Sequence, residues 1–347
     1  MENNQLPENP GSAEPKGCVN CGSRLVEENY PTRLCSSCRE LFIKFPIPLG
    51  IRLFGIGVGL VLIFAMFSFP KNFMLAKHLE KGKQYEAKKQ YKSAQREFSD
   101  VVWQVPDNLE ANEHLAIAAF YNLDVEKFVR TVDKMQGKKV EDEALYNQLS
   151  DLVTRAKGFF PDKELDEVLM KFNDKSQVPD SVFTNYLKEK PDNEYALFFY
   201  ASKLYGRQDL VGCDSLLQKL LGVDTEHLMA LRMLATIARQ RGQLQESTQY
   251  CNKIIDINKE AGYAYASLAR TYLKGNKLAK GLEIAQKSVD IDKEDSYNEA
   301  TLAIACHMNK QTAKRDDVIK ELKQRKDSSV TGDLQFAMDV INQKDSL

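Results

Sequence analysis

The feature that most constrains the fold is a 34-residue period in the C-terminal part of the chain. Segments 194–227, 228–261 and 262–295 align at this spacing without gaps, and segment 75–108 shows the same pattern. A period of this length indicates one supersecondary unit that buries its hydrophobic face by stacking on copies of itself. We therefore predict a stack of such units.

Segment 75–108 indicates what each unit contains. Small residues at Gly82 and Ala94 would let two antiparallel helices approach closely, and Tyr85 and Phe98 would fill the space between them. Pro106 would end the second helix, because proline lacks the backbone N–H that a helix needs. The unit is predicted to be a pair of short helices.

These residues resemble the tetratricopeptide repeat. Its signature positions are occupied by Gly82, Tyr85, Ala94, Phe98, Val101 and Pro106, whereas His78 and Lys81 replace the usual aromatic residue and leucine. The resemblance implies a mainly α fold, an α-solenoid over residues 73–326. Segment 143–191 is expected to be a degenerate repeat with an insertion, and 327–347 a capping helix and tail.

In this family the first helices of the repeats line a concave groove, which gives a candidate partner site. On the best-aligned units the groove would carry Tyr195, Phe198, Ser202, Tyr205, Arg232, Thr236, Arg239, Tyr263, Arg270 and Lys274. Aromatic and guanidinium groups together suit a protein or extended peptide with acidic groups, because arginine can bind a carboxylate through two hydrogen bonds. The asparagines with which some family members clamp a C-terminal carboxylate are missing here. The alternative interpretation is a scaffold with scattered, solvated side chains.

Four cysteines near the N-terminus form a metal-binding pattern. Two Cys-x-x-Cys pairs, Cys18 with Cys21 and Cys35 with Cys38, are separated by thirteen residues, a spacing that lets four thiolates surround one tetrahedral zinc. The pattern resembles the zinc ribbon over residues 17–40 and implies a closed, structural Zn²⁺ site. We expect this segment to be unfolded without zinc. Residues 1–16 are expected to be disordered.

An uncharged apolar run extends from Leu53 to Phe69. A helix over residues 47–70 would be roughly 35 Å long, enough to cross a hydrocarbon core of about 30 Å, so we predict a single transmembrane helix in contact with the lipid bilayer. Gly55 and Gly59 form a GxxxG pair that could let two copies of the helix associate as a homodimer. Ordinary membrane-helix glycines explain the pair equally well.

The two sequence signals for membrane orientation conflict. The basic residues that follow the run outnumber those before it, which places the repeats in the cytoplasm by the positive-inside rule. Thiolate ligands persist best in a reducing compartment, which places the cysteines there instead. Because long domains cross largely regardless of charge, we expect a single-pass protein with a cytoplasmic N-terminus.

Composition and motifs exclude several function classes. The formal net charge of −1 argues against nucleic-acid binding. The sequence holds no metalloprotease, nucleophile-elbow or phosphate-loop motif, so we expect no enzymatic activity. The predicted function is a membrane-anchored scaffold for a protein partner. The alternative is a sensor in which zinc status or a ligand at the ribbon modulates the repeats.

Overall fold

The computed structural model describes residues 17–43, 47–174, 177–325, 328–343 and 347, without the side chains of 65–71 and 328–329. This described part contains helices α1 to α17, one short 3-10 turn and no strand, which confirms the prediction of a mainly α fold. The chain divides between Asn72 and Phe73 into two compact units, and each is described by itself. The prediction for residues 1–16 lies outside the described residues.

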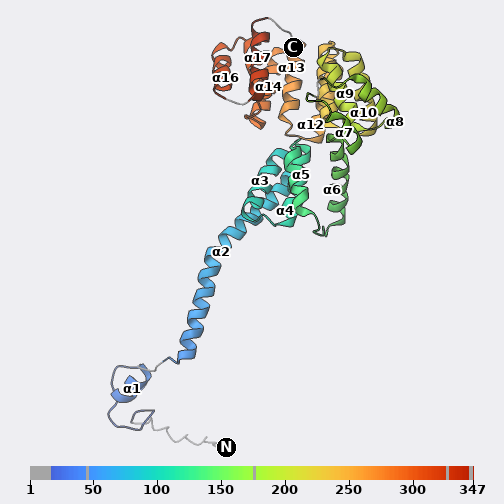
Figure 1. Cartoon of the computed structure of the whole chain (residues 1–347). Helices are drawn as coiled ribbons and strands as arrows, with labels where there is room; N and C mark the ends of the chain where they lie inside the picture. The colour runs from blue at the N-terminus through green and yellow to red at the C-terminus, as the bar shows by residue number, and fades with distance from the viewer. Residues whose placement is uncertain (1–16, 44–46, 175–176, 326–327, 344–346) are drawn as a thin grey trace, which may run out of the picture. The chain divides into compact units, whose positions relative to one another are not determined.

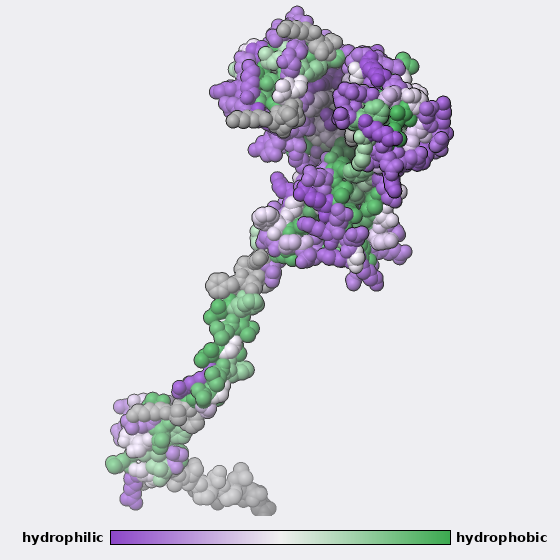
Figure 2. All heavy atoms as spheres, in the orientation of Figure 1, coloured by the Kyte–Doolittle hydropathy of each residue, from purple (hydrophilic) through white to green (hydrophobic). Residues whose placement is uncertain are grey.

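The N-terminal unit holds the cysteine segment, helix α1 (Ser36–Ile43) and the first part of helix α2 (Leu49–Ala87). From Leu49 to Phe64 the described side chains are exposed, and most of them are apolar. Figure 2 shows this hydrophobic surface along the helix.

The predicted membrane span is wrong. Across the residues that the structure describes, no helix is both long and apolar enough to cross a membrane. The side chains of 65–70, the rest of the predicted span, lie outside the description. The predicted single-pass location with a cytoplasmic N-terminus depended on this span and is therefore also wrong. The predicted bilayer contact through 47–70 loses its support for the same reason.

The second unit is built from helix pairs, as predicted (Figure 1). The end of α2 pairs with α3 (Tyr91–Gln104), and α4 (Leu109–Tyr121) with α5 (Val125–Met135). The three gapless segments hold α9 (Glu194–Gly206) with α10 (Leu210–Val223), α11 (Leu228–Gln240) with α12 (Leu244–Ile257), and α13 (Gly262–Lys274) with α14 (Leu278–Ile291). A further pair, α15 (Ser296–Met308) and α16 (Thr312–Gln324), is followed by α17 (Ser328–Ile341).

The turn inside each pair has a recurring backbone conformation. One residue with φ between 57° and 77° occurs in each turn, at Lys89, Leu123, Gln208, Gly242, Asn276 and Lys310. Successive members of this set lie 34 residues apart, except between Leu123 and Gln208. The left-handed conformation costs roughly 1–2 kcal/mol for a residue with a Cβ, so packing of the two helices must offset it in all turns except that of Gly242. The structure itself thus repeats with the period of the sequence, which makes the fold tetratricopeptide-like.

The interruption of that period falls in the segment predicted to be irregular. Here the chain forms α6 (Glu143–Ala156), the 3-10 turn η1 (Lys157–Phe159), α7 (Lys163–Leu169) and α8 (Asp180–Glu189). The regular register resumes at α9, where Asn193 caps the helix by accepting a hydrogen bond from Ala196 N at 2.9 Å.

The sequence did not predict that the first repeats contact the later ones. Glu260, in the turn before α13, accepts hydrogen bonds from the backbone N–H and the hydroxyl of Ser93, both at 2.7 Å. The backbone N–H of Lys259 donates to the carbonyl oxygen of Lys89 at 2.8 Å. Asn258 donates to the carbonyl oxygen of Tyr121 at 3.1 Å. The turn between α12 and α13 is therefore tied to α3 and to the end of α4.

The close helix approach at Gly82 gives a testable prediction. A Cβ on Gly82 would lie 2.4 Å from the ring of Phe98, which is fully buried. We expect Gly82→Ala to destabilise the chain by about 1–3 kcal/mol, because the ring has no space to move into. The midpoint of urea unfolding, followed by circular dichroism, measures this.

Two further variants control that experiment. Gly222→Ala, in α10, has open space around its Cβ and should leave the midpoint unchanged or raise it by the helix propensity of alanine. Combining Gly82→Ala with Phe98→Leu should cost less than the sum of the two single changes. Additive effects would show that this contact does not set the helix spacing.

Candidate functional sites

The first candidate site is the cysteine cluster in the N-terminal unit. The Sγ atoms of Cys18, Cys21, Cys35 and Cys38 all lie within 4.8 Å of one another, so these residues could hold a metal ion. The Sγ atoms of Cys21 and Cys35 are 3.6 Å apart. This is far longer than a disulfide bond, and it matches the sulfur separation of about 3.8 Å expected for tetrahedral Zn–S bonds of about 2.3 Å.

Backbone turns hold the two cysteine pairs in place. The N–H of Gly22 donates to the carbonyl oxygen of Cys18 at 2.8 Å, and Gly22 has a φ of 75°, which glycine adopts at little cost. The second pair leads directly into α1, where the N–H of Arg39 donates to the carbonyl oxygen of Cys35 at 2.9 Å. The two knuckles are joined where the N–H of Val19 donates to the carbonyl oxygen of Arg33 at 3.0 Å.

The environment of Cys18 favours its thiolate. Hydrogen bonds from the backbone N–H groups of Cys35, Cys21 and Asn20 outweigh burial and lower the pKa of Cys18 to about 6. A thiolate is the form that binds metals. At Cys21 a backbone hydrogen bond with Ser23 lowers the pKa, but hydrogen bonds with the Cys38, Cys35 and Cys18 thiols raise it to about 12, so the four thiols do not all favour the thiolate. The close spacing of the four Sγ atoms is what fits a four-sulfur metal site.

The second candidate site is the surface formed by the first helices of the later pairs. It contains Arg232, Arg239, Tyr263 and Arg270 from the predicted groove, together with Tyr297 of α15 and Phe336 of α17. We call these six residues the arginine–aromatic surface. The guanidinium of Arg232 lies 5.2 Å from the ring centroids of both Tyr263 and Tyr297. That of Arg270 lies 3.9 Å from the ring of Tyr297 and 4.8 Å from that of Phe336.

Two of these arginines are buried without an acidic partner. Arg239 and Arg270 are only 4% and 5% exposed. Arg239 hydrogen-bonds the hydroxyl of Ser267 at 3.0 Å, and Arg270 that of Thr301 at 2.8 Å. Within the described residues, no carboxylate forms an ion pair with Arg232, Arg239 or Arg270. The Nε atom of Arg239, the Nη2 atom of Arg270 and the hydroxyl of Tyr263 are buried without a hydrogen-bond partner in that part of the chain.

Titration behaviour reflects this concentration of positive charge. Burial, joined by the nearby charge of Arg239, lowers the pKa of Arg270. Burial alone would raise the pKa of Tyr297, but Arg270, Arg239 and Arg232 together lower it below its usual value. Asp333 acts on Arg270 in the opposite direction, and Arg232 acts on Asp295, although neither carboxylate forms an ion pair with these arginines among the described residues. The three guanidinium groups still make the surroundings of Tyr297 electropositive.

The other predicted groove residues are distributed more widely. Phe198 and Tyr205 line a cavity together with Arg232. Lys274 donates to a main-chain oxygen of Leu347. Tyr195 lies apart, stacked on Phe199 with ring centroids 5.6 Å apart. Its neighbours include Thr154 and Phe160, so the structure separates it from the arginines.

Two residues of the arginine–aromatic surface were missed by the sequence analysis. Tyr297 lies 34 residues after Tyr263, so extending the groove into the next helix pair would have found it. Phe336 belongs to α17, which was predicted only as a cap, and no repeat signal marks it. Pairing of two copies at Gly55 and Gly59 stays a prediction. Among the described residues a Cβ at either position would meet nothing within 4 Å, so no contact within the chain explains these glycines.

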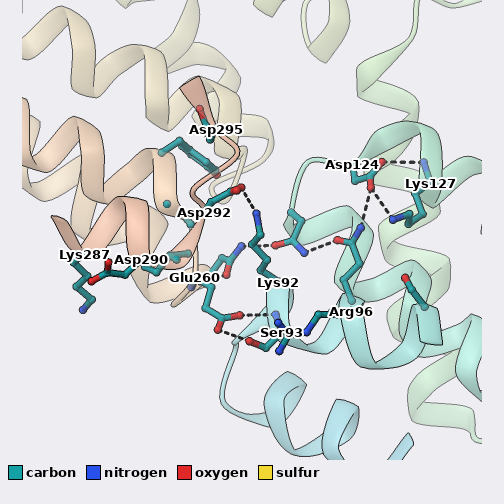
Figure 3. A pocket seen from close by; sticks show the side chains of 18 residues that line it. Lys92, Ser93, Arg96, Asp124, Lys127, Glu260, Lys287, Asp290, Asp292 and Asp295 are labelled. Carbon is teal, nitrogen blue, oxygen red and sulfur yellow. Dashed lines mark hydrogen bonds and ion pairs between the residues drawn. The ribbon is translucent and has the colours of Figure 1, made fainter. Parts of the chain in front are cut away.

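The third candidate site is a cavity of about 720 Å³ between α3, α5 and the α13–α14 region (Figure 3). Its walls carry charges of both signs, and many pair with each other. Lys92 pairs with Asp292, and Lys127 lies 3.4 Å from Asp124. The contacts of Ser93 with Glu260 cross the same space. These contacts join the early and late repeats, which gives this cavity a structural role.

No family model matches the chain, and no curated protein matches it in sequence. Solved structures of similar fold include MamA, with 16% identity and a TM-score of 0.38 over 53% of this chain and 99% of that one. A tetratricopeptide repeat protein from Parabacteroides merdae ATCC 43184 has 15% identity and a TM-score of 0.38 over 76% of this chain and 99% of its own. Pseudomonas aeruginosa PilF has 11% identity and a TM-score of 0.35 over 76% of this chain and 96% of its own. Such values carry no functional argument, and the description of the fold rests on the helix pairs and their turns.

The cysteine cluster gives a prediction about metal content. We expect Cys35→Ser to reduce bound zinc from one ion per chain to none, because three thiolates and a hydroxyl bind zinc much more weakly than four thiolates. Inductively coupled plasma mass spectrometry of the purified full chain measures this. Cys213→Ser, a buried repeat position, is the control and should keep its zinc. An unchanged zinc content in Cys35→Ser would contradict the assignment.

Proposed function

We propose that this chain is a non-enzymatic interaction scaffold whose arginine–aromatic surface binds an extended, acidic segment of a partner protein. The observation that carries the proposal is the set of three guanidinium groups without acidic partners in the described chain, two of them buried. In the N-terminal unit, we propose that the four cysteines hold one structural Zn²⁺ ion.

The energetic argument begins with the cost of burying charge. An ionised group removed from water is unfavourable unless a partner charge and hydrogen bonds compensate. Arg270 bonds one hydroxyl, and Arg239 bonds both the hydroxyl and, at 3.4 Å, the carbonyl oxygen of Ser267. Each arginine also has one buried nitrogen without a hydrogen-bond partner among the described residues. A carboxylate from another molecule would compensate both the charge and the open hydrogen-bonding capacity, through short charge-assisted bonds.

The arrangement of the surface favours an extended ligand. Its residues come from four successive first-position helices, α11, α13, α15 and α17. Packed helices lie about 8–10 Å apart, which an extended chain covers with about three residues at 3.3 Å each. A segment with acidic side chains spaced about three residues apart could therefore meet Arg232 and Arg270 in turn. The tyrosine rings between them would contact its apolar atoms.

The local contacts of three of the four histidines support a non-catalytic role. His78 pairs with Glu97 at 2.6 Å and His114 with Glu86 at 3.0 Å, in both cases between neighbouring helices. His227 caps α11 by accepting a hydrogen bond from Ala230 N at 3.2 Å. Each therefore acts in local packing, and none lies beside a candidate nucleophile in the described chain.

Charge reversal at Arg232 tests the proposed binding. Arg232 is exposed, so Arg232→Glu should fold normally. The probe is a fluorescein-labelled twelve-residue Gly/Ser peptide that carries four glutamates, with binding followed by fluorescence anisotropy. We expect the variant to bind at least tenfold more weakly, a loss of about 1.4 kcal/mol.

Arg130→Glu on α5 is the matched control, because that arginine is also exposed and pairs only with Glu126 among the described residues. It should bind the peptide as the wild type does. Equal loss in the two variants would indicate non-specific attraction, and no loss in Arg232→Glu would refute the site.

A second prediction concerns stability. We expect Arg270→Met to raise the free energy of unfolding by about 1 kcal/mol, because methionine keeps the contact with Tyr297 and removes an uncompensated buried charge. The same variant should lose most of its affinity for the glutamate peptide. Urea unfolding and anisotropy measure the two effects. Arg270→Lys keeps the charge and should gain no stability; a loss of stability in Arg270→Met would show that the arginine serves the fold.

A further inference from the structure

The face between α9 and α11 carries a cavity of about 240 Å³ beside the arginine–aromatic surface. It is lined by Phe198, Tyr205, Met229, Arg232, Met233 and Thr236. Its volume equals that of roughly eight water molecules, which is room for one large side chain.

Apart from the guanidinium of Arg232, the polar side-chain groups of this lining already form hydrogen bonds within the chain. The hydroxyl of Thr236 donates to the carbonyl oxygen of Arg232 at 3.1 Å, one turn earlier in α11. The hydroxyl of Tyr205 accepts a hydrogen bond from Gln240 at 3.1 Å. Besides Arg232, what remains toward the cavity is aromatic and thioether surface. Water there would find few hydrogen-bond partners, so an apolar group that displaces it gains free energy.

Arg232 connects this cavity to the charged surface. Its guanidinium lines the cavity and also lies 5.2 Å from the rings of Tyr263 and Tyr297. A ligand carboxylate bound to Arg232 would therefore bring the neighbouring residues of the same ligand to the mouth of the cavity. In an extended chain, residues one to three positions away lie about 3–10 Å from the carboxylate-bearing residue.

We infer that the partner segment carries one bulky apolar side chain, leucine, methionine or phenylalanine, within three residues of an acidic residue. The apolar side chain fills the cavity and the acidic residue pairs with Arg232. This inference rests on the proposed function and adds the chemical class of the ligand. The occupant is part of the partner protein, because the Arg232 guanidinium at the edge of the cavity complements a carboxylate beside the apolar group. The flexible side chains of Met229 and Met233 let the cavity adapt to apolar groups of different shape.

Matched peptides test the inference on the full chain. The glutamate peptide described above is compared with versions that carry one leucine at one to five residues from a glutamate, or serine at the same position. We expect leucine to improve binding at least tenfold over serine at spacings of one to three residues. Equal binding of the leucine and serine peptides at every spacing would overturn the inference and leave the proposed function standing. Failure of both sets to bind would overturn the proposed function itself.

Variants of the lining locate the effect. Thr236→Trp should fill the mouth and reduce binding of the leucine peptide to that of the serine peptide. Thr248→Trp on α12 is the matched control, because Thr248 is also half-buried and its hydroxyl also bonds a carbonyl one turn earlier, that of Leu244 at 2.8 Å. It should keep the leucine preference.

Enlarging the cavity gives a test that does not depend on loss of binding. Met233→Ala should shift the preferred side chain from leucine to tryptophan by at least fivefold in relative affinity. Preservation of the leucine preference in Thr236→Trp, or an unchanged ranking of side chains in Met233→Ala, would show that the apolar group binds elsewhere.

Discussion

The second compact unit of the chain, Phe73–Leu347, depends on the close packing of two short helices in each repeat, across a turn that contains one left-handed residue. At Lys89, Leu123, Gln208, Asn276 and Lys310 that residue has a Cβ and adopts its conformation at a cost. Packing between the helices offsets the cost, as at Gly82, where the absence of a side chain admits the ring of Phe98. The turn thereby fixes how each first helix is presented, and the first helices carry the proposed binding surface.

If the proposed function holds, that surface gives up stability for recognition. Most buried side chains of the repeats are apolar, but Arg239 and Arg270 are charged and lack acidic partners in the described residues. A core selected for stability alone would replace them with apolar groups. Their positions beside Tyr263 and Tyr297 are explained most simply by a ligand that supplies the missing negative charge. The unbound chain is then the less stable of its two states, and binding stabilises the fold.

The sequence predicted the regular part of the fold and the cysteine cluster, because both follow from local spacing. Helices in the 34-residue segments were predicted from small and large residues at fixed positions, and the close approach of the four cysteines from two short motifs. The predicted span over 47–70 was wrong, since no helix in the described part of the chain is both long and apolar enough to cross a membrane. The partners of Arg270 were only partly predictable. Tyr297 repeats the position of Tyr263, but Phe336 and the cavity beside Met229 and Met233 depend on how separate helices pack.

The contacts of Glu260 with Ser93 change how the repeat unit should fold and unfold. In a simple repeat stack each unit contacts only its neighbours, so ends can unravel independently of the middle. Here hydrogen bonds join residues 167 positions apart in sequence. Such pairing raises contact order, which slows folding, and it couples the first helix pairs to the later ones. The unit should therefore lose its structure in one cooperative step over these repeats, as a compact globular domain does, and resist fraying from its N-terminal end.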